Sequence, residues 1–341
     1  MMKLYLHTYD LPLRHVFAIS RESRTVQRTL IVELRDGNLA GFGEATANPH
    51  YYHVSIEGMM EKLESLRPII ENHPLDSPEQ FWADLQPHLA EMPFALCALD
   101  VAANDLYARR LNLPLYKVWG LSAEHIPISN YTIGIASIEE MVAKMEEMPW
   151  PLYKIKLGTD HDLDIVRALR QHTDAAFRVD ANCAWTPAQT IALAPELKAL
   201  GVEFIEQPLL ADNWAGMKKV YAESALPIIA DESCRIEADV DACHNHFHGI
   251  NIKLMKCGGL TPARRMIARA RELGMKVMVG CMTESTIGIS AIAQLLPLLD
   301  YVDMDGPLLL SKDIGTGVQV ASTGVVYATL PGTGAVLTGF E

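Results

Sequence analysis

Ionisable residues follow one another at nearly even intervals through the middle of this 341-residue chain. In chain order they are Lys156, Asp180, Glu206, Asp231 and Lys253, separated by 24, 26, 25 and 22 residues. Each stands at or just after the end of a short run rich in β-branched or aromatic residues. Such intervals match one strand-plus-helix unit of a parallel barrel, and catalytic residues of barrels stand where the strands end. The spacing therefore predicts that these five side chains meet at one mouth.

The three acids of this series suit a hard divalent cation. Asp180, Glu206 and Asp231 offer only oxygen ligands, which Mg²⁺ prefers, and no His or Cys joins them to favour zinc. Carboxylates that converge in one place repel one another unless a cation lies between them. The alternative is that each acid merely caps the helix after its strand. Three acids in register favour the magnesium site.

The two lysines of the series are candidates for acid and base. Lys156 and Lys253 belong to the second and sixth predicted strands, so we expect them to face each other across the acids. A partly desolvated lysine near another cation has a lowered pKa and can act as a base. Lys154 shares a strand face with Lys156 and is predicted to supply that second charge. Taken singly, a lysine in a KxK run is more often an ion-pair partner.

The first third of the chain predicts an α+β unit. Residues 3–9, 27–35 and 39–44 read as strands, and Asp36-Gly37-Asn38 is a strong hairpin turn. From Ser55 to about Arg110 the pattern becomes helical, and FALCALDVAANDLYARR predicts one buried helix. We expect an antiparallel sheet followed by helices.

After about residue 120 the pattern changes to short β-rich runs that each precede a helical segment. These runs are ISNYTI, YKIKLG, AFRVDAN, EFIEQP, PIIADES, INIKLM, KVMVG and YVDMD. Alternation of this kind predicts an α/β fold with a parallel barrel. An open doubly wound sheet is the alternative, but neither GxGxxG after the first run nor GxxxxGK occurs. We expect a barrel over 121–310, with 311–341 returning to a first domain over 1–120.

Composition and charge bound the class of protein. Hydrophobic residues make up 49% and charged residues 21%, which excludes a disordered or fibrous chain. The formal charge is −13, from 29 Lys and Arg against 42 Asp and Glu, and it opposes binding to nucleic acid or anionic membranes.

We find neither a signal-peptide pattern nor a membrane-length apolar run, and the six cysteines form no CxxC pair. We expect a cytoplasmic protein with free thiols. A homo-oligomer remains an open alternative.

At this point a family resemblance is plain. YKIKLG, RVDANCAW, EFIEQP, IIADES and NIKLMKCGG resemble the successive barrel motifs of the enolase superfamily, in its muconate-lactonizing subgroup. The resemblance covers essentially the whole chain. It implies a modified TIM barrel, (β/α)7β, behind an N-terminal α+β capping domain. It also implies Mg²⁺ on the three acids and an enediolate reached by removal of a proton α to a carboxylate.

The resemblance implies that one lysine lies on each face of the substrate α-carbon. It therefore implies a two-lysine 1,1-proton transfer that inverts the configuration of this carbon. In VDMDGP, Asp303 and Asp305 resemble the signature of dipeptide epimerases, which implies that they bind the substrate's α-ammonium. The negative charge of these two acids also favours a substrate with a free α-ammonium, because N-acylated substrates would leave two buried carboxylates unpaired. The alternative is that both acids cap a final turn.

The stretch FAISRESR, in an expected mobile loop, resembles the FxIxRxSR pattern of L-Ala-D/L-Glu epimerases. This implies that Arg24 pairs with the carboxylate of a Glu side chain, which a guanidinium suits well. Solvated loop arginines are the alternative. Further candidates near the substrate are Arg21, Asn182, Tyr51 and Cys281, for which core or surface roles stay open.

The leading hypothesis is an isomerase, a Mg²⁺-dependent epimerase of dipeptides such as L-Ala-D/L-Glu, acting in the turnover of cell-wall peptides. An N-acylamino acid racemase or an o-succinylbenzoate synthase of the same superfamily is the alternative within the family. A non-catalytic small-molecule binder is the alternative from another class.

Overall fold

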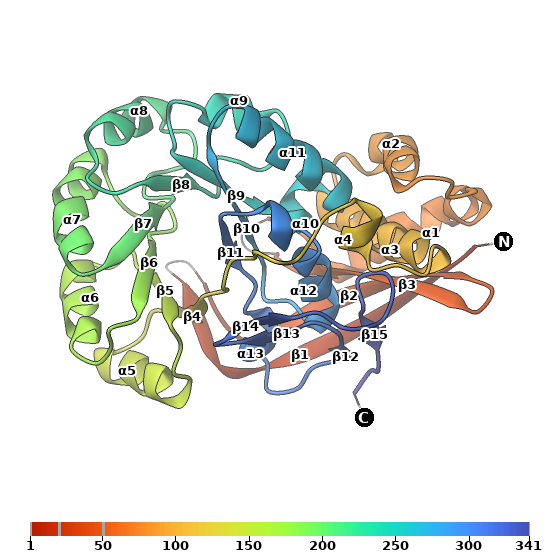
Figure 1. Ribbon diagram of the computed structural model, residues 1–341, viewed down its shortest axis with the longest axis horizontal. Helices are drawn as coiled ribbons and strands as arrows, with labels where there is room; N and C mark the ends of the chain where they lie inside the picture. Colours follow the sequence, from red (N-terminus) through yellow and green to blue (C-terminus); the bar gives the residue numbers. More distant parts are fainter. Residues whose placement is uncertain (1, 20–21, 50–51, 341) are drawn as a thin grey trace.

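The protein is described by a computed structural model that covers residues 2–19, 22–49 and 52–340. Eight parallel strands form a nearly closed barrel, and a three-stranded antiparallel sheet lies beside it (Figure 1). The barrel strands are β4 (Tyr131–Ile133), β5 (Leu152–Lys156), β6 (Ala176–Asp180), β7 (Val202–Glu206), β8 (Ile228–Ala230), β9 (Gly249–Lys253), β10 (Lys276–Gly280) and β11 (Tyr301–Asp303). Each strand overlaps one of the eight predicted runs, and β5, β7 and β9 begin one residue before theirs. They pair in chain order, and a bridge between Ser129 and Val302 joins the two ends.

Helices connect consecutive barrel strands and cover the outside of the barrel (Figure 1). They are α5 (Ile138–Glu147), α6 (Asp162–Arg170), α7 (Pro187–Ala199), α8 (Trp214–Glu223), α9 (Asp239–Cys243), α10 (Leu254–Cys257) with α11 (Leu260–Glu272), and α12 (Thr286–Ala293) with the short η1 (Leu296–Leu298). Capping boxes begin two of them, at Ser137 with Glu140 and at Thr186 with Gln189. Seven helical connections between eight strands give the (β/α)7β order that the resemblance implied.

The N-terminal sheet consists of β1 (Lys3–Ile19), β2 (Glu22–Asp36) and β3 (Leu39–Thr46). The predicted turn is present, with Gly37 at a φ of +58°. However, β1 and β2 extend past the predicted strands, so the prediction of a loop over 13–25 is wrong for most of these residues. Backbone pairing resumes after a register shift and includes Phe17 with Arg24. The backbone N–H of Ile135 also donates to the carbonyl of Ala18 over 3.1 Å, which ties this arm to the barrel.

Four helices follow the sheet: α1 (Ile56–Asn72), α2 (Pro78–Leu89), α3 (Pro93–Arg110) and α4 (Leu115–Val118). The predicted buried helix is α3, and β3 lies directly against it. A Cβ at Gly43 would overlap the backbone carbonyl of Ala98, so only glycine permits this approach.

The C-terminal segment contains α13 (Gly306–Leu309), β12 (Gly315–Thr316), β13 (Gln319–Ala321), β14 (Gly324–Val326) and β15 (Val336–Leu337). Leu310, Ile314 and Ala335 share a small core with Leu11 and Ile31 of the N-terminal sheet. These contacts support the division that we propose, a capping domain over 1–120 with the return of 311–341 and a barrel over 121–310.

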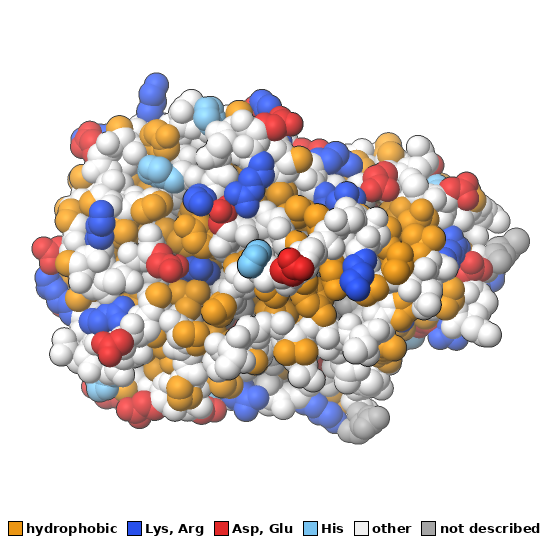
Figure 2. Space-filling view, in the orientation of Figure 1, with side chains coloured by type: hydrophobic (Ala, Val, Ile, Leu, Met, Phe, Trp, Pro, Cys, Tyr) orange, Lys and Arg blue, Asp and Glu red, His pale blue; other side chains and the backbone are white. Residues whose placement is uncertain are grey.

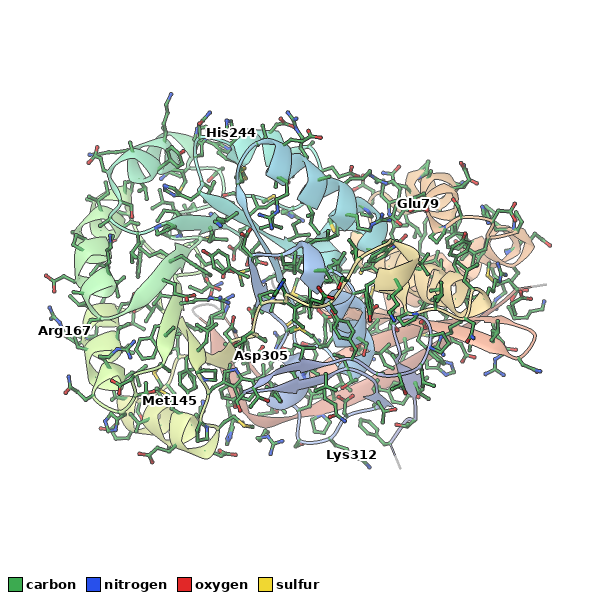
Figure 3. The ribbon with its side chains drawn as sticks, viewed as in Figure 1. Glu79, Met145, Arg167, His244, Asp305 and Lys312 are labelled. Atoms are coloured by element: carbon green, nitrogen blue, oxygen red, sulfur yellow. The ribbon has the colours of Figure 1, made fainter. Side chains whose placement is uncertain are left out.

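The surface carries charges of both signs. Figure 2 shows Lys and Arg side chains interspersed with Asp and Glu side chains over one face. Within the described residues, the helices are all too short or too polar to cross a membrane. In Figure 3, Asp305 lies toward the middle of the molecule, whereas Arg167 and His244 lie at its edge. Asp305, which follows the last barrel strand, is 2% exposed and so belongs to the interior.

Candidate active site

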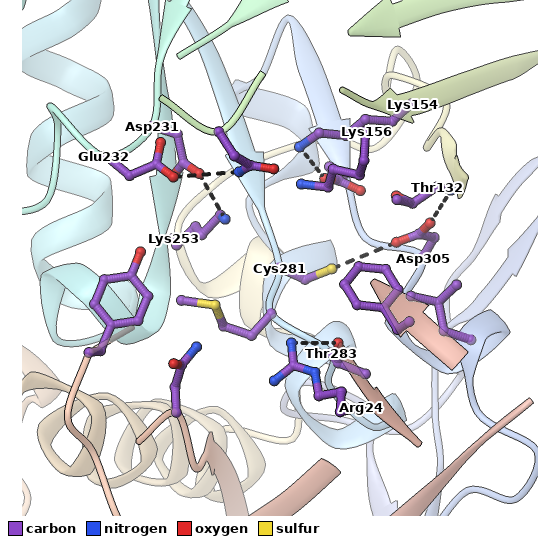
Figure 4. A pocket seen from close by; sticks show the side chains of 17 residues that line it. Arg24, Thr132, Lys154, Lys156, Asp231, Glu232, Lys253, Cys281, Thr283 and Asp305 are labelled. Atoms are coloured by element: carbon purple, nitrogen blue, oxygen red, sulfur yellow. Dashed lines mark hydrogen bonds and ion pairs between the residues drawn. The ribbon is translucent and has the colours of Figure 1, made fainter. Parts of the chain in front are cut away.

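A cavity lies where the barrel strands end, beneath the arm formed by β1 and β2 (Figure 4). Predicted site residues in its lining are Arg24, Lys154, Lys156, Asn182, Asp231, Lys253, Cys281, Asp303 and Asp305. Asp180 and Glu206 are completely buried and contact the lysines of this lining. Arg21 and Tyr51 lie outside the described residues. The fold thus gathers the remaining predicted residues from strands that are far apart in the chain.

Three acids form a compact cluster at the strand ends. Asp180, Glu206 and Asp231 each place one carboxylate oxygen so that all three oxygens lie within 4.8 Å of one another. Burial, together with the charges of Asp180 and Asp231, raises the pKa of Glu206 to about 7. Three buried oxygen donors that oppose one another's ionisation fit a hard divalent cation such as Mg²⁺. The structure thus offers a suitable donor set.

Lysines from two distant strands contact these acids. The Lys156 ammonium, from β5, donates to Asp180 Oδ2 over 2.6 Å. The Lys253 ammonium, from β9, lies 3.0 Å from Asp231 Oδ2. In Figure 4 the two side chains reach into the cavity from different sides. This placement agrees with the predicted pair, whose catalytic role remains a proposal.

The predicted lowering of a lysine pKa is wrong for Lys253. Burial by itself lowers the pKa of Lys253, but Asp231 and other neighbours raise it by more, and the result lies well above the ordinary value. Lys154 behaves in the same way. It lies 2.8 Å from Glu206 and 2.9 Å from Asp303, so it is itself paired with acids. Direct carboxylate partners, which spacing does not reveal, decide the direction.

Asp303, which ends the last strand, and Asp305, which follows it, differ from each other. Lys154 and the Asn130 amide both contact Asp303, and Lys154 outweighs burial to lower the pKa of Asp303 to about 2. Asp305 accepts from the backbone N–H of Thr132 over 2.5 Å, and burial together with Asp303 raises its pKa to about 7. Among the described residues, none forms an ion pair with Asp305. Asp305 is therefore the better placed of the two to receive a new cation.

Arg24 reaches the cavity from β2. Its Nη2 donates to Thr283 Oγ1 over 3.4 Å, and its guanidinium carbon lies 5.8 Å from the centre of the Phe17 ring. Figure 4 shows Arg24 and Thr283 on the side of the cavity away from the acid cluster. Arg24 is therefore a partly buried residue of the cavity lining, and its contact with substrate stays a prediction.

The remaining predicted candidates have polar neighbours in the cavity. Asn182, at a φ of +43°, donates its backbone N–H to Asp180 Oδ1 over 3.0 Å. The Cys281 thiol lies 3.9 Å from Asp305 Oδ1, and burial raises its pKa well above the ordinary value, so the thiol stays protonated.

Sequence reasoning missed several polar residues that support the acids. The Asn251 amide donates to Glu206 Oε1 over 2.8 Å, and Glu232 lines the cavity next to Asp231. Asn251 stands two residues before Lys253, so strand alternation places both on one face and could have indicated it. Lys256, which contacts Asp231, follows the end of its strand, and periodicity offers no signal for it.

The fold and the site together define a barrel enzyme of one superfamily. Residues 2–120 match the N-terminal domain of mandelate racemase and muconate lactonizing enzyme, and residues 136–339 match the enolase C-terminal domain-like family. The chain belongs to this mandelate racemase/muconate lactonizing enzyme family of the enolase superfamily. It is an isomerase.

Individual relatives are similar over most or all of their lengths. An L-Ala-D/L-amino acid epimerase of Flavobacterium johnsoniae is 59% identical over 336 residues, which cover 98% of this chain and 100% of that protein. An L-Ala-D/L-Glu epimerase of Bacteroides thetaiotaomicron is 38% identical, with 98% and 87% covered.

Solved structures agree. The L-Ala-D/L-Glu epimerase of Bacillus subtilis, in a substrate-liganded complex, has a TM-score of 0.93 at 28% identity over 98% of each chain. The dipeptide epimerase of Methylococcus capsulatus, solved with Mg and L-Arg-D-Lys, has a TM-score of 0.90 at 32% identity, with 98% and 99% covered.

Proposed function

We propose that the protein is a Mg²⁺-dependent dipeptide epimerase that inverts the α-carbon of the C-terminal residue, with L-Ala-D/L-Glu as its substrate. The observation that carries this proposal is the pair of lysines, Lys156 and Lys253, that enter the cavity from different sides of the acid cluster. The names of the relatives support it, since they are called epimerases of L-Ala-D/L-amino acid and L-Ala-D/L-Glu dipeptides.

In this proposal Asp180, Glu206 and Asp231 hold the metal ion. A bound Mg²⁺ supplies positive charge that favours loss of a proton α to a carboxylate, which is otherwise too weak an acid for a lysine to deprotonate. Lys156 takes the proton from one face of the carbon and Lys253 returns one to the other face, or the reverse for the other epimer. The intermediate between the two proton transfers is an enediolate, and the outcome is inversion.

The other end of the cavity suits a free dipeptide. Asp305, with Asp303 beside it, would bind the substrate ammonium, because an N-acylated substrate leaves the buried Asp305 without a cationic partner. Arg24 would bind the carboxylate of a C-terminal Glu side chain. This charge pattern favours the epimerase over an N-acylamino acid racemase, although an N-succinyl-L-Arg/Lys racemase of Bacillus cereus is 31% identical to this chain.

A dipeptide with these features is a fragment of the kind that turnover of cell-wall peptides releases. We therefore propose a cytoplasmic role in that turnover.

The deciding experiment is a dipeptide library incubated with the enzyme and Mg²⁺ in D₂O, followed by mass spectrometry and chiral separation. We expect L-Ala-L-Glu to gain one deuteron and to yield its epimer. Exchange of N-acylamino acids together with inert free-amine dipeptides would favour the racemase instead. Inertness of every compound would leave only a non-catalytic binder.

A further inference from the structure

A fourth lysine lies behind the acid cluster and has no role in the proposal above. Lys256 belongs to α10, directly after β9, and its side chain is completely buried. Its ammonium lies 2.6 Å from Asp231 Oδ1, 2.5 Å from the backbone carbonyl of Asp231 and 3.2 Å from that of Cys234. A lysine ammonium has three N–H donors, so these acceptors use all of them. Lys256 therefore cannot also bind substrate.

These contacts determine which oxygen Asp231 offers to the cavity. Oδ1 faces Lys256, while Oδ2 lies 3.0 Å from the Lys253 ammonium. The backbone N–H of Asp231 is also held, since it donates to Gln207 Oε1 over 2.9 Å. The Asp231 carboxylate is thus fixed through Oδ1, and its backbone is fixed through both its N–H and its carbonyl. A ligand fixed in this way loses little conformational entropy when it binds.

We infer that Lys256 is a positioning residue, which fixes the Asp231 carboxylate so that Oδ2 faces the metal position and Lys253. The inference rests on the proposed function, because Asp231 is a metal ligand only there. Two other roles predict different results. A lysine that served only as a buried charge would oppose cation binding, and its removal would tighten that binding. A lysine that served only to fill space would leave cation binding unchanged.

The test is the affinity of Lys256→Met for Mn²⁺, measured by electron paramagnetic resonance with Mn²⁺ as the probe of the magnesium site. Loss of a partner that orients a metal ligand weakens binding by about 10- to 100-fold. We expect a Mn²⁺ Kd at least tenfold higher than in the wild type, with a lower kcat and a smaller change in dipeptide KM. An unchanged or tighter Kd would overturn the inference.

A matched control separates positioning from stability. Arg109→Met breaks another ion pair with a completely buried acid, between Arg109 Nε and Asp105 Oδ2 at 3.1 Å, away from the cavity. We expect it to lower the melting temperature and to keep the wild-type Mn²⁺ Kd. If Lys256→Met does not fold, Lys256→Gln takes its place, because its amide retains two donors, and we expect a smaller loss of affinity in the same direction.

The proposed function can fail independently of this inference. Wild-type protein that binds Mn²⁺ but exchanges no dipeptide proton would contradict the dipeptide substrate, while the two Kd values would still decide the role of Lys256. Wild-type protein that binds no Mn²⁺ would contradict the metal site and this inference together.

Discussion

Charge is concentrated around one cavity of this protein, although ionised groups are costly to bury. Lys154 and Lys156 are almost completely removed from solvent, and each has a carboxylate partner within 3 Å. A buried pair contributes little to stability over apolar residues of the same size, so stability does not explain such a cluster. The proposed proton transfer and cation binding would explain this cluster, so the activity is tested first on single residues.

If the two lysines act as acid and base, replacing either one should abolish most of the epimerase activity. Lys156→Ala and Lys253→Ala should each lower the rate of epimerisation of L-Ala-L-Glu by about 10³-fold or more, since each removes the acid or base for one face. Chiral chromatography of the products measures this. The control is Lys276→Ala. Lys276 lies at the end of β10 away from the cavity and pairs with Asp300 at 2.9 Å, so this variant should keep the wild-type rate. A single-lysine variant that still epimerises at that rate would contradict the mechanism.

The proposed role of Arg24 predicts that its loss changes which dipeptide is preferred and leaves the epimerisation step itself intact. Arg24→Ala should raise the KM for L-Ala-L-Glu about tenfold or more, and should change that for L-Ala-L-Val much less, because only the first substrate has a second carboxylate to pair. Steady-state kinetics with both dipeptides measures the ratio. Arg28→Ala removes an exposed arginine of the same strand as a control. Equal losses for both dipeptides would show that Arg24 does not recognise the Glu side chain.

Asp305 predicts a pH dependence of substrate binding. Because burial and Asp303 raise its pKa to about 7, Asp305 is protonated below that pH and cannot pair with an ammonium. The dipeptide amine stays protonated there, since α-amino groups titrate near 8. The KM of L-Ala-L-Glu should therefore rise as the pH falls from 7.5 to 5.5, while Asp305→Asn should show a high KM with little change over this range. A flat wild-type profile would contradict this assignment.

Between elements, one buried acid joins the capping domain to the barrel. Asp100 of α3 accepts from the backbone N–H of Thr261 over 3.0 Å and from its hydroxyl over 2.6 Å, at the start of α11. Burial raises the pKa of Asp100 to about 7, against about 4 in an unfolded chain. Between these pH values the folded protein binds more protons than the unfolded chain, so stability falls as the pH rises.

The contribution of Asp100 to this fall is up to about 4 kcal/mol by pH 8. Asp100→Asn keeps an acceptor for Thr261 and has no proton to lose. Its free energy of unfolding should therefore decrease less than that of the wild type between pH 5 and pH 8. Urea denaturation at both pH values measures the difference, and parallel decreases in the two proteins would contradict the raised pKa.

At the scale of the whole molecule, the proposed metal site on the acid cluster predicts that activity depends on a metal ion. Treatment with EDTA should abolish exchange of the dipeptide α-proton, and Mg²⁺ should restore it. A ligand that binds only the folded state raises its stability, so the melting temperature should also rise when Mg²⁺ is added. Differential scanning fluorimetry measures this, with Asp180→Asn as a variant that should respond less. Full activity in EDTA would contradict the metal site.

Much of the architecture could be predicted from the sequence. The eight β-rich runs and the buried helix α3 lie where periodicity indicated them, because parallel strands and buried helices leave a strong apolar pattern. The even spacing of Lys156, Asp180, Glu206, Asp231 and Lys253 was also sufficient to expect them at one mouth. This expectation follows because the strands of a parallel barrel all run in one direction, so their C-terminal ends lie at the same face.

Only the tertiary structure decided how those charges pair. Lys253 contacts Asp231, which raises the lysine pKa that was predicted to be lowered, and Lys154 contacts Glu206 and Asp303. The arm of β1 and β2 likewise reaches the cavity, where Phe17 and Arg24 join the lining, and Ala18 accepts a hydrogen bond from Ile135 of the barrel domain. Periodicity reports which face of an element is buried. Pairing and pKa depend on distances between atoms that lie far apart in the chain, and only the folded chain sets those distances.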